Sequence, residues 1–323
     1  MSAPTAWVAL LDAGAGHDAE YAGGLSNHRP MALLALARLG ANDSQLRNFD
    51  ASYSRRLRPA PPAVAWPVGD AWASRLGQPE AWPLYRDLFV QWLDNEAAGD
   101  VLRQVLPTLM QGCGAAAFHG LIRTAYAVQA AHRQELADAL AYWACRWLDL
   151  GSSDFHGTEA DPERLLRQLR ITPSDASLIF QRMQVAAAHT RCQATVFQLK
   201  VGPKTLNRLA TLAARAYAAS GNFTALHLVT SAHALRVLQP WLMDEPPVLD
   251  RAFCAYWRAF AAAVCVAGLR VLPPAPLRPW PAIVAQAVSS DDDHVIKLVD
   301  SCREQERALG GAIWRQAASR AIA

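Results

Sequence analysis

The sequence predicts an all-α fold: a multi-helix bundle with a buried central pocket and a metal site. Ala, Leu and Arg are frequent, whereas alternating runs of Val, Ile and Thr are scarce, which favours helix over strand. Hydrophobic residues make up 52% of the 323 residues and charged residues 18%, so the chain can bury a large core. Four histidines lie far apart in the chain, each inside a dense local pattern: His28, His119, His227 and His294.

The N-terminal part contains one clear helix and one long connection. Two short strands are an open alternative, for instance around Trp7–Leu11. Pro30 suits the first turn of a helix that ends at Gly40. Proline runs such as RPAPPAVAWP disfavour helix and predict an extended surface connection at about 50–82. Apart from this connection, we expect a single helical domain over residues 1–323.

The other helices follow from apolar periodicity and from breaks at proline and glycine. Their expected bounds are Pro83–Leu106, Ala115–Ala131, Gln134–Leu148, Thr172 to about Thr190, Lys204–Ser220, Asn222 to near Pro240, Asp250–Leu269 and Ser289–Gly310, with a short helix at the end. Asn222 or Thr224 can cap the helix that carries His227. Ser289–Asp291 can cap the helix that carries His294.

The bulk properties narrow the possible partners. The net charge is +3 and the basic residues are scattered, so neither nucleic acid nor a membrane is expected as a partner. The N-terminus lacks the basic region of a signal peptide, and the six cysteines form no CxxC pair. Reduced thiols and a cytoplasmic location are therefore expected. The absence of GxGxxG, P-loop, HExxH and GxSxG motifs leaves no dedicated nicotinamide or flavin fingerprint.

The four patterned histidines are candidate metal ligands. Distant helices that each bring one imidazole inward are the usual way in which a helical protein builds a metal centre, and neutral imidazole is the commonest such ligand. Lys297 lies one turn after His294 on the same face. Lys297 could serve a metal only after losing its proton or becoming a carbamate, and otherwise it binds an anion or pairs with a neighbouring aspartate.

Several neighbours of these histidines are candidates for support or for catalysis. One member of Asp291–Asp293 could hold a histidine N–H. Arg123 and Tyr126 share the face of His119, where a cation and a phenol can hold an anionic substrate. His233 lies about 240° round the helix from His227, so it belongs to a pocket wall or to ordinary packing. Hydroxyls that could orient the ring of His227 are those of Thr224, Thr230 and Ser231. The competing interpretation is that these are core histidines, with an arginine leading to solvent.

The chain resembles the questin oxidase family in four segments that occur in the family's order. These are YAGGLSNHRPMALLALARLGA at 21–41, GAAAFHGLIRTAYA at 114–127, LHLVTSAHALR at 226–236 and DDDHVIKLVDSC at 291–302. The resemblance implies an all-helical fold and oxidation of aromatic substrates with dioxygen. It also implies an iron site formed by His28, His119, His227, His294 and a carboxylated Lys297. The chain is shorter than the fungal members, and Arg123 stands where those members carry a second histidine.

The leading hypothesis is a non-haem Fe(II) oxygenase for a polycyclic or hydroxylated, anthraquinone-like aromatic. It would act by Baeyer–Villiger-like insertion or by ring-cleaving dioxygenation, with Arg123, Tyr126 and His233 as catalytic candidates. A requirement for NADPH and a homodimeric state are left open. The alternatives are a zinc-type hydrolase or lactonase that uses histidines and a carbamylated lysine, and a non-catalytic helical binding protein.

Overall fold

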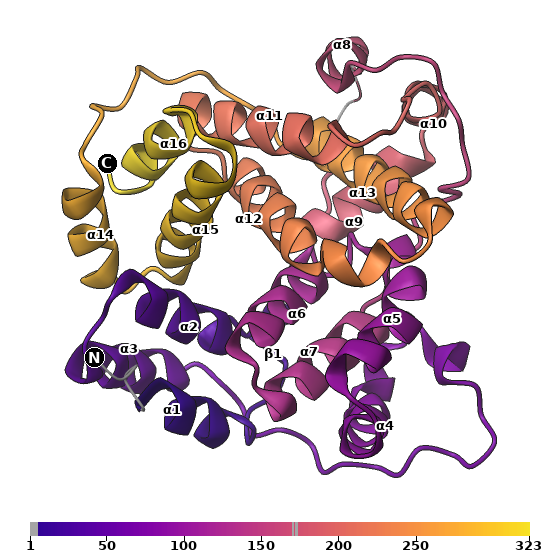
Figure 1. The fold of residues 1–323 in the computed structure, drawn as a ribbon, viewed down its shortest axis with the longest axis vertical. Coiled ribbons are helices and arrows are strands. Elements are labelled where there is room, and N and C mark those ends of the chain that lie inside the picture. The colour runs from indigo at the N-terminus through magenta and orange to yellow at the C-terminus, as the bar shows by residue number, and fades with distance from the viewer. Residues whose placement is uncertain (1–5, 170, 172–173) are drawn as a thin grey trace.

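The structure, a computed structural model shown in Figure 1, describes residues 6–169, 171 and 174–323. These residues form sixteen α-helices and one two-stranded antiparallel hairpin, so the all-α prediction is confirmed. The helices are α1 Ala6–Gly14, α2 Arg29–Leu39, α3 Asp43–Ser54, α4 Trp82–Asn95, α5 Ala98–Leu109, α6 His119–Ala130, α7 Arg133–Cys145, α8 Pro162–Gln168, α9 Ile179–Ala188, α10 Thr190–Val196, α11 Thr205–Ser220, α12 Phe223–Leu238, α13 Pro246–Val266, α14 Trp280–Val288, α15 Asp293–Leu309 and α16 Ile313–Ala321. The hairpin pairs β1 Glu20–Tyr21 with β2 Leu25–Ser26, and short 3₁₀ helices are η1 Trp72–Arg75, η2 Pro79–Ala81, η3 Met110–Gly112 and η4 Gln239–Leu242.

Four helices form a closed ring in the middle of the molecule, here called the four-helix ring (Figure 1). Helix α2 contacts α6 and α15, and α12 contacts the same two helices. Helices α6 and α12 are buried over most of their circumference, as expected for helices that are apolar on all sides. Polar side chains at the ends of these helices therefore point into the protein interior rather than into solvent.

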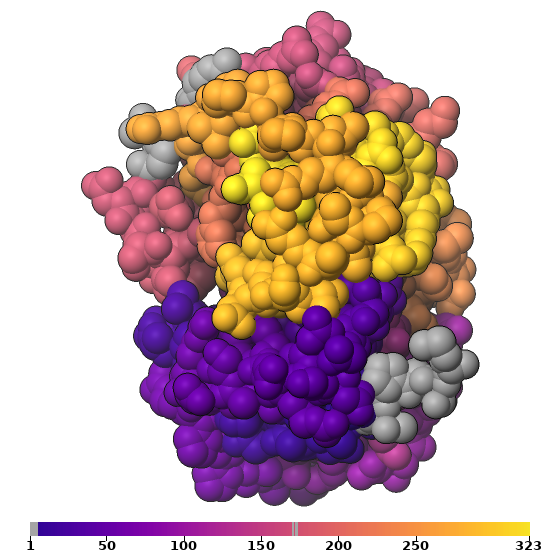
Figure 2. Space-filling view, turned by 90° about the vertical axis from the view of Figure 1, so that its left-hand side faces the viewer, coloured from indigo at the N-terminus to yellow at the C-terminus, as the bar shows by residue number. Residues whose placement is uncertain are grey.

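The N-terminal and C-terminal parts of the chain pack against each other at one side of this ring. Helix α15 packs against α2, and α14 contacts α2 as well. Figure 2 shows the yellow C-terminal segment directly above the indigo N-terminal helices. The outer layer is completed by α4 on α7, α11 on α16 and α13 on α9. This arrangement brings residues near position 28 next to residues near position 294.

Most of the predicted helix ends are confirmed, and each has a local cause. Gly40 and Gly221 end α2 and α11 in the left-handed conformation, with φ of 95° and 59°. Asn222 caps α12, because its side chain accepts from the backbone N–H groups of Thr224 and Ala225. The cap of α15 is Asp292, one residue beyond the predicted caps.

Several predicted segments need correction. Trp7–Leu11 lies inside α1 and not in a strand; the strands follow at residues 20–26. The proline-rich connection begins after α3, because a capping box between Asn42 and Gln45 starts a helix that continues to Ser54. The predicted helix over 83–106 is two helices, since Glu96 and Ala97 take extended backbone angles between α4 and α5.

Two further helices differ from their predicted bounds. Helix α13 begins at Pro246, because proline is accepted at the first helical position. The helix predicted from Thr172 begins, within the described residues, at Ile179, and Thr172 and Pro173 themselves lie outside those residues. Over the described ranges, no helix combines the length and the apolar character that crossing a bilayer requires.

Candidate metal centre

The four candidate histidines lie at the N-terminal ends of the four helices of the ring. His28 is the N-cap of α2, His119 is the first residue of α6, His227 is in the second turn of α12, and His294 is the second residue of α15. All four line one pocket of about 450 Å³. The positive ends of four helix dipoles therefore meet at this pocket.

The backbone before His119 is strained. The φ angles of Ala116, Ala117 and Phe118 are 45°, 56° and 71°, which residues with a side chain rarely adopt. Each such residue costs on the order of 1–3 kcal/mol unless its surroundings enforce it. This turn explains why α6 begins at His119 and not at the predicted Ala115. It also places the carbonyl oxygen of Ala116 against Nδ1 of His119.

Three of the four rings form a hydrogen bond through Nδ1. The acceptors are the Asp293 carboxylate for His28, the Ala116 carbonyl for His119, and the Phe223 carbonyl for His227, the last at 2.8 Å. Nδ1 of His294 lies within ion-pair distance of two carboxylates, 3.2 Å from Asp293 and 3.5 Å from Asp292. None of the four Nε2 atoms has a hydrogen-bond partner among the described residues, and those of His119 and His294 are fully buried. A proton on Nδ1 leaves the lone pair of Nε2 free, which is the tautomer of a metal-bound histidine.

The rings are close enough to share one ion. Ring-centroid distances are 4.5 Å for His28–His119, 4.6 Å for His28–His294, 4.9 Å for His119–His227 and 5.6 Å for His227–His294. One nitrogen each of His28, His119 and His294 lies within 4.8 Å of the other two. Two nitrogens that each lie ~2.1 Å from a common ion are separated by up to ~4 Å. His28, His119 and His294 therefore fit a metal ion after a small contraction, whereas His227 lies beside this group without belonging to it.

Three of these histidines are held neutral. Burial is the main cause that lowers the pKa of His28 to about 3, and the positive charge of Lys297 adds to it. Burial also holds the pKa of His119 and of His227 well below the ordinary value, with neighbouring histidines as the next cause. A neutral imidazole keeps the lone pair that a metal requires, so these three histidines are in their ligating form near pH 7.

Asp293 and Lys297 lie next to these rings. Burial disfavours the charge of Asp293, but His28 and Lys297 hold its pKa below the usual range. The Nζ atom of Lys297 is 3.6 Å from Oδ2 of Asp293, and its side chain is only 3% exposed. The structure thus shows the histidine–aspartate contact that the acidic run predicted, with Asp293 as the residue involved.

The three predicted catalytic residues lie outside the lining of this pocket. The Arg123 guanidinium forms two hydrogen bonds with the buried Glu135 carboxylate of α7, at 2.6 and 2.9 Å. The Tyr126 hydroxyl donates to Oδ2 of Asp300 at 3.0 Å. His233 is buried on α12, and both of its ring nitrogens lack a partner in the described part of the chain. The geometry places all three in the packing around the pocket, so the interpretation of Arg123 as a substrate contact needs correction.

Two of the three hydroxyls predicted to orient His227 bond elsewhere, and the third residue, Thr224, lines the histidine pocket. Thr230 bonds to backbone carbonyls of its own helix, and Ser231 bonds to the Tyr256 hydroxyl at 2.9 Å. The ring of His227 is instead oriented by the backbone carbonyl of Phe223, one turn earlier on the same helix. Because this acceptor is a backbone atom of an apolar residue, the pattern of polar side chains does not predict it.

The Arg123–Glu135 pair gives a stability prediction. Replacing Arg123 by Met should lower the free energy of unfolding by about 3–5 kcal/mol, because the Glu135 carboxylate is left buried without its cation. The double variant Arg123→Met, Glu135→Leu should recover most of that loss. Denaturant unfolding followed by circular dichroism measures both. A single variant that unfolds like the wild type would show that the pair contributes little.

The remaining walls of the pocket come from residues that the sequence analysis did not name as site candidates. The hairpin contributes Tyr21 and Leu25, the start of α9 contributes Leu178 and Phe180, and α12 contributes Phe223. The ring centroid of Phe223 lies 4.7 Å from those of both His227 and His294. An apolar, partly aromatic wall beside polar nitrogens is typical of a site for a flat organic ligand.

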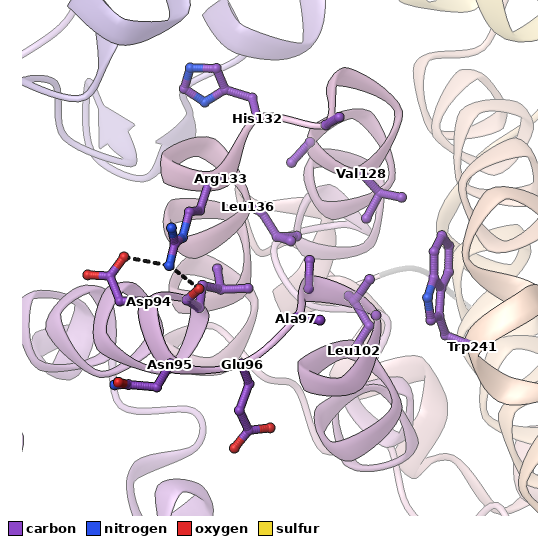
Figure 3. A pocket seen from close by; sticks show the side chains of 15 residues that line it. Asp94, Asn95, Glu96, Ala97, Leu102, Val128, His132, Arg133, Leu136 and Trp241 are labelled. Atoms are coloured by element: carbon purple, nitrogen blue, oxygen red, sulfur yellow. Dashed lines mark hydrogen bonds and ion pairs between the residues drawn. The ribbon is translucent and has the colours of Figure 1, made fainter.

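A second pocket of about 550 Å³ lies between α4, α5 and α7 (Figure 3). Its charged side chains are engaged with each other, as in the 2.7 Å ion pair between Arg133 and Asp94. Trp241 closes one side, and the Glu96 carboxylate points away from the centre of the view. This pocket lacks a convergent set of metal-ligating nitrogens, so the histidine pocket is the better candidate site.

The fold and the histidine pocket define a helical protein with a candidate metal centre between four helix ends. A family model described as questin oxidase-like matches residues 25–302, which include all four histidines and Lys297. The chain belongs to the questin oxidase-like family. A search among curated proteins gives no match. Family membership indicates oxidoreductase activity of the oxygenase type on a small, anthraquinone-like molecule.

Proposed function

We propose that the protein is a non-haem Fe(II)-dependent oxygenase of a hydroxylated polycyclic aromatic, with dioxygen as co-substrate. The observation that carries this proposal is the convergence of four histidines on one pocket, with Nδ1 of three rings engaged in hydrogen bonds and no hydrogen-bond partner for any Nε2 among the described residues. A histidine-rich site with an anionic oxygen donor suits Fe(II). The pocket volume of about 450 Å³ lies within the range of small-molecule sites.

In this proposal His28, His119, His227 and His294 hold the iron. When bound, the iron supplies the electrons that activate dioxygen. The protein orients the ligands. Asp293 fixes the orientation of the His28 ring, and the carbonyl groups of Ala116 and Phe223 fix the rings of His119 and His227. Phe223 and Phe180 offer apolar surface on which a planar substrate can lie, and the hairpin and α9 restrict the access of water.

Lys297 completes the proposed site as a carbamate. The ammonium group first loses a proton, and the neutral amine then combines with CO₂ and releases a second proton, so the charge of the side chain changes from +1 to −1. The positive ends of four helices disfavour a cation at the pocket, and a carbamate would offset that effect. Burial lowers the pKa of Lys297 to about 8, so roughly a tenth of the amine is neutral and able to react at pH 7.

The Lys297 proposal predicts a dependence on bicarbonate. Fe(II) affinity should rise when bicarbonate is added to the wild type and should not respond in the variant Lys297→Met. Titration of the metal-free protein under anaerobic conditions measures both affinities. Equal responses of the two proteins would remove Lys297 from the ligand set while leaving the four histidines in place.

The same variant has a pH signature in the metal-free protein. The unfolded chain keeps the lysine proton up to about pH 10.5, whereas the folded chain releases it near pH 8. The unfolded state therefore binds more protons between these values, and the free energy of unfolding rises with pH by up to about 3 kcal/mol. Lys297→Met should flatten this rise in denaturant unfolding curves measured from pH 7.5 to 10.5. A rise of equal size in the variant would show that other groups cause it.

The decisive test of the function is metal content followed by oxygen uptake. Near-stoichiometric iron in protein purified anaerobically without a histidine tag, together with oxygen consumption on hydroxylated anthraquinones, would support the proposal. Labelled dioxygen then separates the two reactions: insertion incorporates one oxygen atom and needs two electrons from a reductant such as NADPH, whereas ring cleavage by dioxygenation incorporates both. Zinc without oxygen uptake would favour a hydrolase, and no metal at all a binding protein.

A further inference from the structure

Arg182 is a pocket residue without a counter-charge. It lines the histidine pocket from α9, and its Nε atom is fully buried with no hydrogen-bond partner in the described part of the chain. No ion pair involves Arg182 within the described ranges, and the residues outside them, 1–5, 170, 172 and 173, include neither Asp nor Glu. A buried guanidinium N–H that has lost its hydration without gaining an acceptor is destabilising, so its position calls for an acceptor from outside the chain.

Some partly buried arginines of this protein have acidic partners: Arg38 bonds to Asp300 at 3.0 Å, and Arg86 bonds to Asp138 at 2.7 Å. Buried Arg258 shares the state of Arg182, because it donates only to the Leu150 carbonyl and keeps two buried nitrogens without a partner among the described residues. Arg182 differs from Arg258 in lining the histidine pocket, where a bound molecule can supply the acceptor.

The surroundings of Arg182 favour an anion that is attached to an apolar body. Asp293, the carboxylate nearest to the histidines, contacts His28 but does not line the pocket, so it leaves Arg182 uncompensated. The N-terminal ends of the four ring helices and of α9 add positive potential. The walls next to Arg182 are apolar, with Leu178, Ile179 and Phe180 preceding it on the same segment.

We propose that Arg182 determines specificity by binding an anionic oxygen, a phenolate or a carboxylate, on the planar aromatic substrate of this pocket. A guanidinium binds such oxygens through charge-assisted hydrogen bonds and can stack on an aromatic face. This inference rests on the proposed function, because it takes the pocket to be the substrate site. It extends that proposal by naming the group on the substrate that the protein recognises.

The test uses the metal-free full-length chain, so that binding is measured apart from any metal contact. Isothermal titration compares anthraquinone-2-carboxylate with the uncharged anthraquinone-2-carboxamide, and follows 2-hydroxyanthraquinone across the ionisation of its phenol. The proteins are the wild type, Arg182→Gln and Arg182→Lys, with Arg47→Gln as a control that removes the same charge from an exposed site on α3. Circular dichroism confirms that each variant is folded.

The wild type and Arg47→Gln should bind the carboxylate at least about tenfold more tightly than the carboxamide, the size expected for one charge-assisted hydrogen bond. Arg182→Gln should reduce this ratio to near one, and Arg182→Lys should keep part of it. Tighter binding of 2-hydroxyanthraquinone above its pKa would identify a phenolate as the recognised group; a preference for the carboxylate alone would identify an aromatic acid.

Two results would overturn the inference, and they differ in their scope. If the wild type binds the charged and uncharged anthraquinones equally, or if Arg182→Gln keeps the wild-type ratio, Arg182 has no role in recognition while the pocket still binds aromatics. If no anthraquinone binds the wild type with or without Fe(II), the aromatic-oxygenase proposal fails, and this inference fails with it.

Discussion

Replacing His227 by Ala should reduce bound iron from about one equivalent to background, whereas replacing His233 by Ala should leave it unchanged. Both residues are buried histidines on α12, six positions apart. Only His227 lines the pocket, with Nδ1 held by the Phe223 carbonyl and Nε2 without a partner among the described residues. His227→Ala removes one of the four proposed metal ligands, whereas His233→Ala removes none.

The two variants are a matched pair because their costs in packing are similar. Each removes a buried ring from the same helix, so both should lose some stability while keeping the helical circular dichroism of the wild type. Elemental mass spectrometry after anaerobic reconstitution measures the metal. Full occupancy in His227→Ala would exclude this residue as a ligand, and loss of iron in His233→Ala would show that the site lies deeper on α12 than proposed.

The sequence revealed the histidines because each lies in a distinctive local pattern near a predicted helix start. Pro30 and Asn222 are local signals, and they identified the ends of helices at which His28 and His227 lie. Helical periodicity predicted Arg123 on the face of His119. Periodicity could not show what surrounds Arg123, because its partner Glu135 belongs to the next helix, α7, which runs in another direction.

The remaining parts of the site depend on tertiary structure. The contact between His28 and Asp293 joins residues 265 positions apart, and only the packing of α15 on α2 creates it. The left-handed turn at Ala116–Phe118 contains no glycine, so no local sequence signal predicts it. Arg182 follows a segment without a pattern of charges, and only the folded chain brings it to the pocket, where no acidic side chain pairs with it in the described part of the chain.

Asp293→Asn should weaken Fe(II) binding about 10- to 100-fold, the usual effect of losing a carboxylate that orients a ligating histidine. The Asp293 carboxylate accepts from Nδ1 of His28, and its Oδ2 is also 3.2 Å from Nδ1 of His294 and 3.6 Å from Nζ of Lys297. An amide in its place carries no charge. The variant therefore loses both the orientation of two rings and the compensation of a buried ammonium.

Asp292→Asn is the matched control for this experiment. Asp292 is the adjacent residue, 58% exposed, and caps α15 through the backbone N–H groups of His294 and Val295. Asparagine caps a helix about as well as aspartate, so this variant keeps the helix start and removes one nearby charge. If both variants weaken Fe(II) binding equally, the effect comes from charge or from the contacts that both aspartates make with His294; a loss confined to Asp293→Asn assigns it to the contact with His28. Because the pKa of Asp293 is below the usual range, this difference should persist at pH 5.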